Sequence, residues 1–262
     1  MSEVLFQINH LTKKFGGLIA INDFSMEIRE GEILGLIGPN GAGKTTLFNC
    51  ISHFYKPDAG EILMGGNNLL QLKPHQVAEM GIGRTFQNIE LFGNLTVREN
   101  LLIGQHRLIR SGFFSTTFFL KRCREEEKRV LERAEEIGVR LGLGGVMDSL
   151  ISGLPLGTRK LVELARALVL EPKLVLLDEP VAGMNPMESE TLARVITEIR
   201  GRLGITVFLI EHDMGLVMRI CDRLYVLHYG KKIAEGIPAE VRRNALVIAA
   251  YLGQEGDLAP QD

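Results

Sequence analysis

The sequence predicts an α/β fold in which helices flank a mostly parallel β-sheet. Three short apolar runs, at residues 33–37, 174–177 and 205–210, have the length and composition of strands that are buried on both faces. Segments with helical periodicity follow the first run and separate the other two, the latter at about 186–202. Parallel strands need such crossover helices, so the order of these segments indicates one α/β core.

Length and composition set the broad class. The 262 residues are enough for one well-buried α/β domain with a smaller appendage. Charged residues make up 24% of the chain and the formal net charge is −2, so no basic field indicates a nucleic-acid partner. The three cysteines are scattered, which favours free thiols in a reducing compartment. We expect no signal peptide and no membrane span, and therefore a soluble, cytosolic chain that serves a membrane process only by docking.

Strands of a second kind are predicted near the N-terminus, where apolar and polar residues alternate. The apolar positions are Val4, Phe6, Ile8, Phe24, Met26 and Ile28. This period of two predicts half-exposed antiparallel strands, and thus an antiparallel β subdomain beside the core. Residues 57–68 are turn-rich with one short strand, and residues 224–234 predict a hairpin around Tyr229 and Gly230.

The most informative segment joins the first apolar strand to a helix at 44–52. It matches the phosphate-loop pattern G-x-x-x-x-G-K-[ST] at every fixed position, with the residues Gly38, Pro39, Asn40, Gly41, Ala42, Gly43, Lys44 and Thr45. Backbone N–H groups and the helix dipole there point at one anion, and glycines let the backbone approach it. The loop, with the following Thr46, predicts a nucleoside triphosphate site. Lys44 would bridge the terminal phosphates and the Thr45 hydroxyl would ligate Mg²⁺.

Acidic residues end the other two apolar strands, at Asp178-Glu179 and at Glu211 before His212. Parallel sheets bind ligands beyond the carboxyl ends of their strands. Asp178 would hold Mg²⁺, directly or through water. Glu179 would orient and deprotonate the attacking water, with Pro180 keeping it out of helical geometry. The alternative, a solvent-exposed acidic turn, would leave the phosphate loop without a metal-holding carboxylate. The predicted cofactors are therefore ATP and Mg²⁺.

Together, the phosphate loop, residues 174–179 and His212 after a strand resemble the ATP-binding subunit of ATP-binding-cassette (ABC) transporters, over residues 4–253. The resemblance implies a single ABC ATPase domain at residues 1–253. Its P-loop NTPase core would carry the antiparallel β subdomain and a helical subdomain inserted at about 88–165. Residues 254–262 are polar and are expected to form a disordered tail.

The resemblance also implies roles for single residues. Gln87 matches the glutamine loop, which touches Mg²⁺ or the attacking water and adjoins the membrane subunit. Phe15 matches the aromatic residue that stacks on adenine, although it could instead be a core residue. His212 matches the switch histidine that contacts the γ-phosphate, and it joins Glu179 and Lys44 in the predicted catalytic set.

The family signature, usually Leu-Ser-Gly-Gly-Gln, corresponds here to Leu154, Pro155, Leu156, Gly157 and Thr158. Such signatures act in trans, on ATP held by the other subunit of a head-to-tail dimer. Pro155 supplies neither the hydroxyl nor the backbone N–H of serine, which leaves Gly157 as a backbone donor. Asn185 likewise replaces a usual acidic residue. Both departures concern the opposite ATP site and not this chain's own phosphate loop.

One branch of the family resembles the chain most specifically: the larger ATPase subunit of branched-chain (hydrophobic) amino acid importers. The resemblance rests on residues 16–18, 84–88, 250–253 and a phenylalanine-rich stretch at 113–120. It implies two transmembrane permease subunits, a second and different ATPase subunit, and indirect dependence on a periplasmic solute-binding protein. The location would be peripheral, on the cytoplasmic face of the bacterial inner membrane. The phenylalanines would belong either to the core of a helical hairpin or to the permease interface.

Alternatives stay open, because the ATPase never touches the solute and the solute follows from family likeness alone. Relatives of this branch carry urea or short amides, and the ATPase of lipopolysaccharide export has a similar C-terminal end. A soluble ABC ATPase of DNA repair or translation is a different class. Those proteins are typically tandem cassettes or carry coiled-coil or zinc insertions, and this sequence has one cassette and neither insertion.

Overall fold

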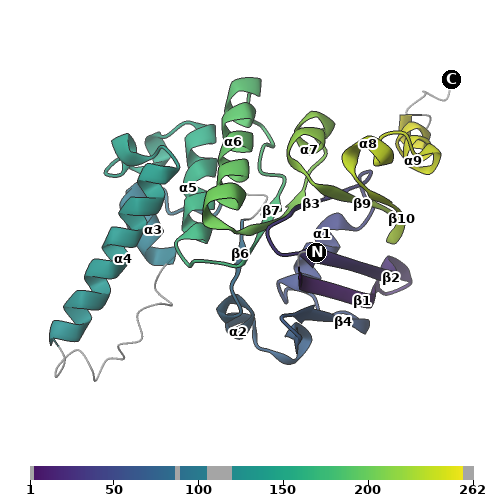
Figure 1. Ribbon diagram of the computed structural model, residues 1–262, viewed down its shortest axis with the longest axis horizontal. Coiled ribbons are helices and arrows are strands. Elements are labelled where there is room, and N and C mark those ends of the chain that lie inside the picture. The colour runs from purple at the N-terminus through teal and green to yellow at the C-terminus, as the bar shows by residue number, and fades with distance from the viewer. Residues whose placement is uncertain (1–2, 86–88, 105–119, 256–262) are drawn as a thin grey trace.

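Two β-sheets form the centre of the structure, a computed structural model that describes residues 3–85, 89–104 and 120–255 (Figure 1). The larger sheet has the strand order β10-β9-β3-β8-β7-β6. Strands β9, β3, β8, β7 and β6 run parallel, and β10 joins antiparallel at the edge. The mostly parallel sheet is therefore confirmed. Its strands are β3 (Ile33–Ile37), β6 (Ile82–Arg84), β7 (Leu174–Asp178), β8 (Thr206–Ile210), β9 (Arg223–His228) and β10 (Lys231–Gly236).

The larger sheet is buried because its side chains alternate between two apolar cores. In β3, Ile33 and Ile37 face one core, and Leu34 and Leu36 face the other. The first core includes residues of α3 (Val97–Gly104), α4 (Leu120–Arg140), α5 (Leu156–Leu168), α6 (Pro186–Leu203) and α7 (Met214–Ile220). The second includes residues of α1 (Lys44–Ile51) and of the smaller sheet. With a core on each face, every position of β3, β7 and β8 is apolar or buried, which explains the continuous apolar runs.

The smaller sheet is antiparallel, as predicted, with the order β2-β1-β4-β5. Its strands are β1 (Val4–Phe15), β2 (Leu18–Arg29), β4 (Ala59–Met64) and β5 (Asn67–Asn68), followed by the 3₁₀ turn η1 (Leu69–Gln71) and by α2 (Pro74–Glu79). The expectation of a single strand at 57–68 is wrong, since β4 pairs with both β1 and β5. Strand β6 was not predicted. Three residues in β6 and two in β5 are too few to show a period.

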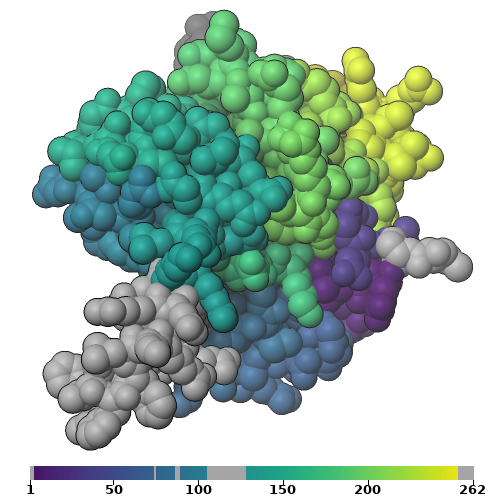
Figure 2. Space-filling model, turned by 60° about the vertical axis from the view of Figure 1, so that its left-hand side comes forward, coloured from purple at the N-terminus to yellow at the C-terminus, as the bar shows by residue number. Residues whose placement is uncertain are grey.

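Helices α3, α4 and α5 pack against one another, with 3₁₀ turns η2 (Gly144–Val146) and η3 (Ile151–Gly153) between the last two. Figure 2 shows this teal segment as a lobe on the opposite side from the C-terminal residues. Ala134 and Ile137 of α4, and Leu141 directly after it, are buried. The phenylalanine-rich stretch lies outside the described residues. Among the residues described, none of the helices has the length and apolarity that a membrane crossing needs.

The C-terminal part begins with the predicted hairpin of β9 and β10 and ends in α8 (Pro238–Val241) and α9 (Ala245–Glu255). Because α9 extends to Glu255, the tail predicted to begin at residue 254 is partly wrong: its first two residues are helical. Residues 256–262 lie outside the described part of the chain.

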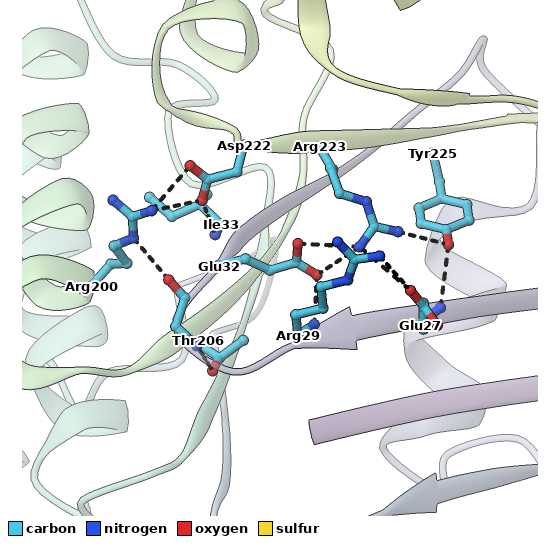
Figure 3. A network of polar contacts seen from close by, with 10 residues as sticks. Glu27, Arg29, Glu32, Ile33, Arg200, Thr206, Asp222, Arg223 and Tyr225 are labelled. Atoms are coloured by element: carbon cyan, nitrogen blue, oxygen red, sulfur yellow. Dashed lines mark hydrogen bonds and ion pairs between the residues drawn. The ribbon is translucent and has the colours of Figure 1, made fainter. Parts of the chain in front are cut away.

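A network of charged residues joins the two sheets at the amino ends of the parallel strands (Figure 3). Glu32, which is 7% exposed, accepts a hydrogen bond of 2.6 Å from the Arg29 backbone N–H. Its carboxylate also lies 3.3 Å from the guanidinium of Arg223, and that guanidinium donates to the Tyr225 hydroxyl at 3.1 Å. The hydroxyl in turn accepts from the Glu27 N–H. The network therefore fixes β2 against β3 and β9.

We expect the core beside α1 to depend on Phe208, which is fully buried with its ring centroid 4.9 Å from that of Phe48. Phe208→Ala should lower the free energy of unfolding by about 3–5 kcal/mol, because it removes apolar contacts and leaves a cavity. Phe208→Leu, the control, should cost less than about 1.5 kcal/mol. Urea denaturation measures both values. Equal losses in the two variants would contradict this view of the core.

Candidate nucleotide-binding site

The three predicted chemical segments meet because their strands are neighbours. Strand β8 lies between β3 and β7, with Ile210 opposite both Leu36 and Asp178. Since all three strands are parallel, their carboxyl ends lie at one edge of the sheet. The phosphate loop, the Asp178-Glu179 pair and the Glu211-His212 pair follow at that edge, as predicted.

Close backbone contacts surround the phosphate loop. A Cβ atom on Gly38 would lie 2.1 Å from the Leu227 carbonyl oxygen of β9. A Cβ atom on Gly43, whose φ is +108°, would lie 2.5 Å from the Ala20 carbonyl oxygen of β2. In contrast, Gly41 at φ +75° has open space around it. Two of the glycines are therefore required by packing against neighbouring strands, in addition to any approach to phosphate.

Hydrogen bonds hold the same loop from outside. The Gly230 N–H, in the turn between β9 and β10, donates to the Ala42 carbonyl at 2.9 Å. The Gly230 carbonyl accepts from the Asn22 N–H of β2 at 2.8 Å. Consequently, contacts within the chain itself hold the loop between the antiparallel sheet and the C-terminal hairpin.

Lys44 places its ammonium group inside the loop. The side chain is 7% exposed, and Nζ donates to the carbonyls of Gly38 at 2.6 Å and Pro39 at 3.0 Å. Burial lowers the pKa of Lys44, and the charges of Glu179 and Asp178 oppose that shift. Next along α1, Thr45 is exposed and Thr46 is half-buried, while Asn40 is exposed on the loop. The cation thus lies inside the loop, and Thr45 lies in the first turn of α1.

Asp178 ends β7 with a side chain that is only 2% exposed. Burial raises the pKa of this carboxyl, and the Arg84 guanidinium, 3.5 Å away, opposes that shift. The described residues contain no group of three or more His, Cys, Asp or Glu side chains able to hold a metal ion. Carboxylate and hydroxyl oxygens are nevertheless suited to Mg²⁺, which is commonly held by one or two carboxylates together with substrate phosphates. Asp178 and Thr45 fit that kind of site.

Glu179 has a left-handed backbone, with φ +47°. Its N–H donates to the Ile210 carbonyl of β8 at 2.9 Å, and its own carbonyl accepts from the Ala182 N–H. The residue is therefore outside right-handed helical geometry, as expected, but Pro180 does not explain the positive φ, because proline favours an extended backbone at the residue before it. A left-handed non-glycine residue costs about 1–3 kcal/mol, and such strain clusters at functional sites.

Glu211 is the residue whose role the sequence did not reveal. Its carboxylate is fully buried and accepts three backbone N–H groups: those of Val181 at 3.2 Å, His212 at 2.9 Å and Asp213 at 3.1 Å. One carboxylate therefore joins the loop after Glu179 to the loop that carries His212. The only signal in the sequence is an acidic residue directly after a buried strand.

His212 is close to the predicted base. Its side chain is 59% exposed, and Nδ1 lies 3.7 Å from Oε1 of Glu179. The structure therefore brings His212, Glu179 and Lys44 to the same edge of the sheet. Gln87, the other predicted site residue, lies outside the described residues.

Phe15 lies on the surface, so the core alternative for it is wrong. Its side chain is 41% exposed at the end of β1. The Phe15 and Tyr55 rings meet edge to face with their centroids 5.1 Å apart, and the Lys13 ammonium lies 5.0 Å from the Phe15 centroid. Stacking of Phe15 on adenine stays a prediction.

The signature residues begin α5, with Pro155 exposed at the N-cap. Gly157, in the first turn, is buried against Glu188 of α6: a Cβ atom there would lie 2.7 Å from the Glu188 carboxylate. That carboxylate accepts the Asn185 N–H, and the Asn185 side chain accepts the Glu188 N–H, which completes a capping box. Asn185 therefore caps α6, as an aspartate also could. Leu154, Leu156 and Thr158 are half-buried.

Comparison with known proteins gives two family matches. Residues 21–182 match the model described as ABC transporter, and residues 231–257 match the model described as branched-chain amino acid ATP-binding cassette transporter.

The chain is also similar to curated proteins over nearly its whole length. It is 46% identical to the high-affinity branched-chain amino acid transport ATP-binding protein LivG of Salmonella typhimurium, over 97% of this chain and 100% of LivG. It is 39% identical to BraF of Pseudomonas aeruginosa, which carries the same description, with the same coverage. The lipopolysaccharide export system ATP-binding protein LptB of Haemophilus influenzae is 34% identical, over 94% of this chain and 96% of LptB.

Among solved structures, the ADP conformation of MJ1267, an ATP-binding cassette of an ABC transporter, superposes with a TM-score of 0.84 at 33% identity. The match covers 96% of this chain and all of that one. The arrangement of sheets, phosphate loop and helical segment is thus the P-loop NTPase fold of ATP-binding cassettes.

Gly38 supplies a test of the loop. Gly38→Ala should weaken ATP binding by about tenfold or more, because the new methyl group collides with the Leu227 carbonyl and must displace the loop. Gly41→Ala is the matched control: it carries the strain of a positive φ without a collision and should bind ATP more tightly than Gly38→Ala. Titration calorimetry with ATP measures both affinities. Similar affinities for the two variants would argue against the packing constraint.

Proposed function

The chain belongs to the ABC transporter family as an ATP-hydrolysing subunit, and we propose that it energises an importer for branched-chain amino acids. The observation that carries the proposal is the match of residues 231–257 to the branched-chain model, outside the general ATPase match. The 46% identity to LivG over the whole chain supports it.

The site residues would divide the chemistry among them. The loop amides and Lys44 bind and orient the triphosphate, and Thr45, Asp178 and Gln87 would hold Mg²⁺. When bound, the metal offsets the negative charge of the phosphates. Glu179 positions the attacking water and takes its proton, and His212 contacts the γ-phosphate from the neighbouring loop. The left-handed backbone of Glu179 and its contact with β8 fix that carboxylate relative to the phosphate loop.

The partners follow from the same proposal. Two permease subunits would receive the force of ATP binding. A second, different ATPase subunit would complete this chain's ATP site in trans, and this chain's signature would complete the site of that subunit. A periplasmic binding protein would deliver the solute from the other side. The chain would then be peripheral, on the cytoplasmic face of the bacterial inner membrane.

Lipopolysaccharide export is the second candidate function, because the export protein LptB is 34% identical over nearly the same length. The branched-chain model at 231–257 favours import over export. Uptake of urea or short amides by a related system would differ only in the solute. The solute that stimulates ATP hydrolysis distinguishes that system from an importer of branched-chain amino acids.

The proposed function predicts ATPase activity that depends on the solute. In a complex reconstituted with its permease, second ATPase and binding protein, leucine, isoleucine or valine should stimulate ATP hydrolysis, whereas urea and lipopolysaccharide should not. Glu179→Gln should still bind ATP but hydrolyse it about 100-fold or more slowly, because the general base is lost. Lys44→Ala should lose ATP binding itself. Stimulation by urea alone would reassign the solute, and normal turnover by Glu179→Gln would remove Glu179 as the base.

Unequal ATP sites are a further expectation, since Pro155 deprives the signature of two donors. A hydrogen bond to a charged group contributes roughly 1.5–3 kcal/mol, so the site completed by this chain's signature should be the weaker one. Pro155→Ser should preserve or raise activity there, and Glu179→Gln in this chain should impair transport more than the equivalent change in the second ATPase. Transport assays with one mutant subunit at a time measure this. A fully active complex containing this ATPase alone would rule out the heterodimer.

A further inference from the structure

Arg84 is a half-buried cation beside the candidate nucleotide site, and the functions assigned so far do not use it. It is the last residue of β6, the strand that leads toward Gln87, and it pairs in register with Leu176 of β7. Its side chain is 10% exposed. Strand β6 is the outermost strand of the sheet on that side, and the Arg84 side chain extends from it to the end of α1 and to Asp178 of β7.

The guanidinium contacts two separate parts of the site. One nitrogen, Nη1, donates to the Ser52 hydroxyl at 2.7 Å and to the Phe48 carbonyl at 3.4 Å, both at the C-terminal end of α1. The other, Nη2, donates to the Asn49 side-chain oxygen at 3.0 Å and to Oδ2 of Asp178 at 3.5 Å. A single planar group thus spans the phosphate-loop helix and the carboxylate predicted to hold Mg²⁺.

Packing and charge fix the group in this position. Its carbon Cζ lies 5.8 Å from the ring centroid of Phe48 and 5.5 Å from that of Phe54, within cation–π range. A positive charge at the C-terminal end of α1 also complements the helix dipole. Lysine cannot reproduce the arrangement, because an ammonium group lacks the planar fork that reaches several acceptors at once.

Helix α1 connects the contacts of Arg84 to the phosphate loop. Helix α1 has only eight residues, with Lys44 and Thr45 at one end and the Arg84 contacts at the other. A change in the position of its C-terminal end therefore changes the direction in which its N-terminal N–H groups point. The contact between Arg84 and Asp178 would matter for a second reason. Asp178 needs a fixed carboxylate orientation to share a metal ion with Thr45.

We propose that Arg84 is a positioning residue of the ATP site: its guanidinium holds the end of α1 and the Asp178 carboxylate to β6, so that β6, the phosphate-loop helix and Asp178 form one unit. This inference rests on ATP and Mg²⁺ binding at this site, but not on the identity of the transported solute.

The test compares Arg84→Gln with the wild-type chain for binding of the non-hydrolysable analogue AMP-PNP, by calorimetry in EDTA and in excess Mg²⁺. The dissociation constant in Mg²⁺ should rise about tenfold, the loss expected for hydrogen bonds to a charged group. The factor by which Mg²⁺ improves affinity should fall at least about threefold, because Asp178 loses its orientation. The measurement needs no permease, so it can fail while the proposed import function stands.

Arg223→Gln is the matched control. Arg223 is also a half-buried arginine, 16% exposed, with a carboxylate partner and an aromatic ring centroid 5.6 Å away, but it belongs to the network at the opposite edge of the sheet (Figure 3). Both variants should lower Tm, and only Arg84→Gln should change the effect of Mg²⁺. If Arg84→Gln does not fold, Arg84→Lys should show the same reduced effect of Mg²⁺. If Mg²⁺ improved the AMP-PNP affinity of the folded variant by the same factor as in the wild type, Arg84 would have a structural role only, and the proposal would be wrong.

Discussion

The parallel pairing of β3, β8 and β7 is the constraint on which the site depends. Each strand contributes a few residues after its last hydrogen-bonded position, and the register places them at one edge: Leu36 opposite Ile210, and Ile210 opposite Asp178. This order holds only while both faces of the sheet stay covered, because all three strands are apolar on both sides. The helical layer and the antiparallel sheet are therefore conditions for the chemistry as well as for stability.

Around that edge the structure accepts arrangements that are costly elsewhere. Lys44, Asp178 and Glu211 are buried, and Glu179 has a left-handed backbone. Each buried charge has a partner: loop carbonyls for Lys44, Arg84 for Asp178, and three N–H groups for Glu211. Such paired charges contribute little net stability, but breaking one leaves an uncompensated charge. Their value here is orientation, which a site for a highly charged ligand requires.

Much of this could be predicted from the sequence because its signals are local. A phosphate loop between an apolar strand and a helix, and acidic residues after two further strands, were sufficient to place Lys44, Asp178 and Glu179 together. The strands β5 and β6 were missed because two or three residues carry no period. The roles of Glu211 and Arg84 were missed for a different reason: each depends on partners that only folding brings near, such as Glu211 with Val181 and Arg84 with Ser52 and Asp178. The capping role of Asn185 is different, because its partner Glu188 is only three residues away and the pattern is visible in the sequence. The exposure of Phe15 likewise follows from where β1 ends and not from its neighbours in sequence.

The three N–H groups gathered by the Glu211 carboxylate have a mechanical consequence. The loop after Glu179 is bound to one oxygen of this carboxylate and the loop of His212 to the other, so neither loop can shift alone without leaving the buried charge short of a hydrogen bond. Glu179, the proposed general base, and His212 are thus linked through one buried carboxylate. In the proposed function, the histidine that contacts the γ-phosphate and the carboxylate that activates water would then move together. Any displacement of the loop that carries His212, whether caused by nucleotide or by a neighbouring subunit, would therefore also change the position of Glu179.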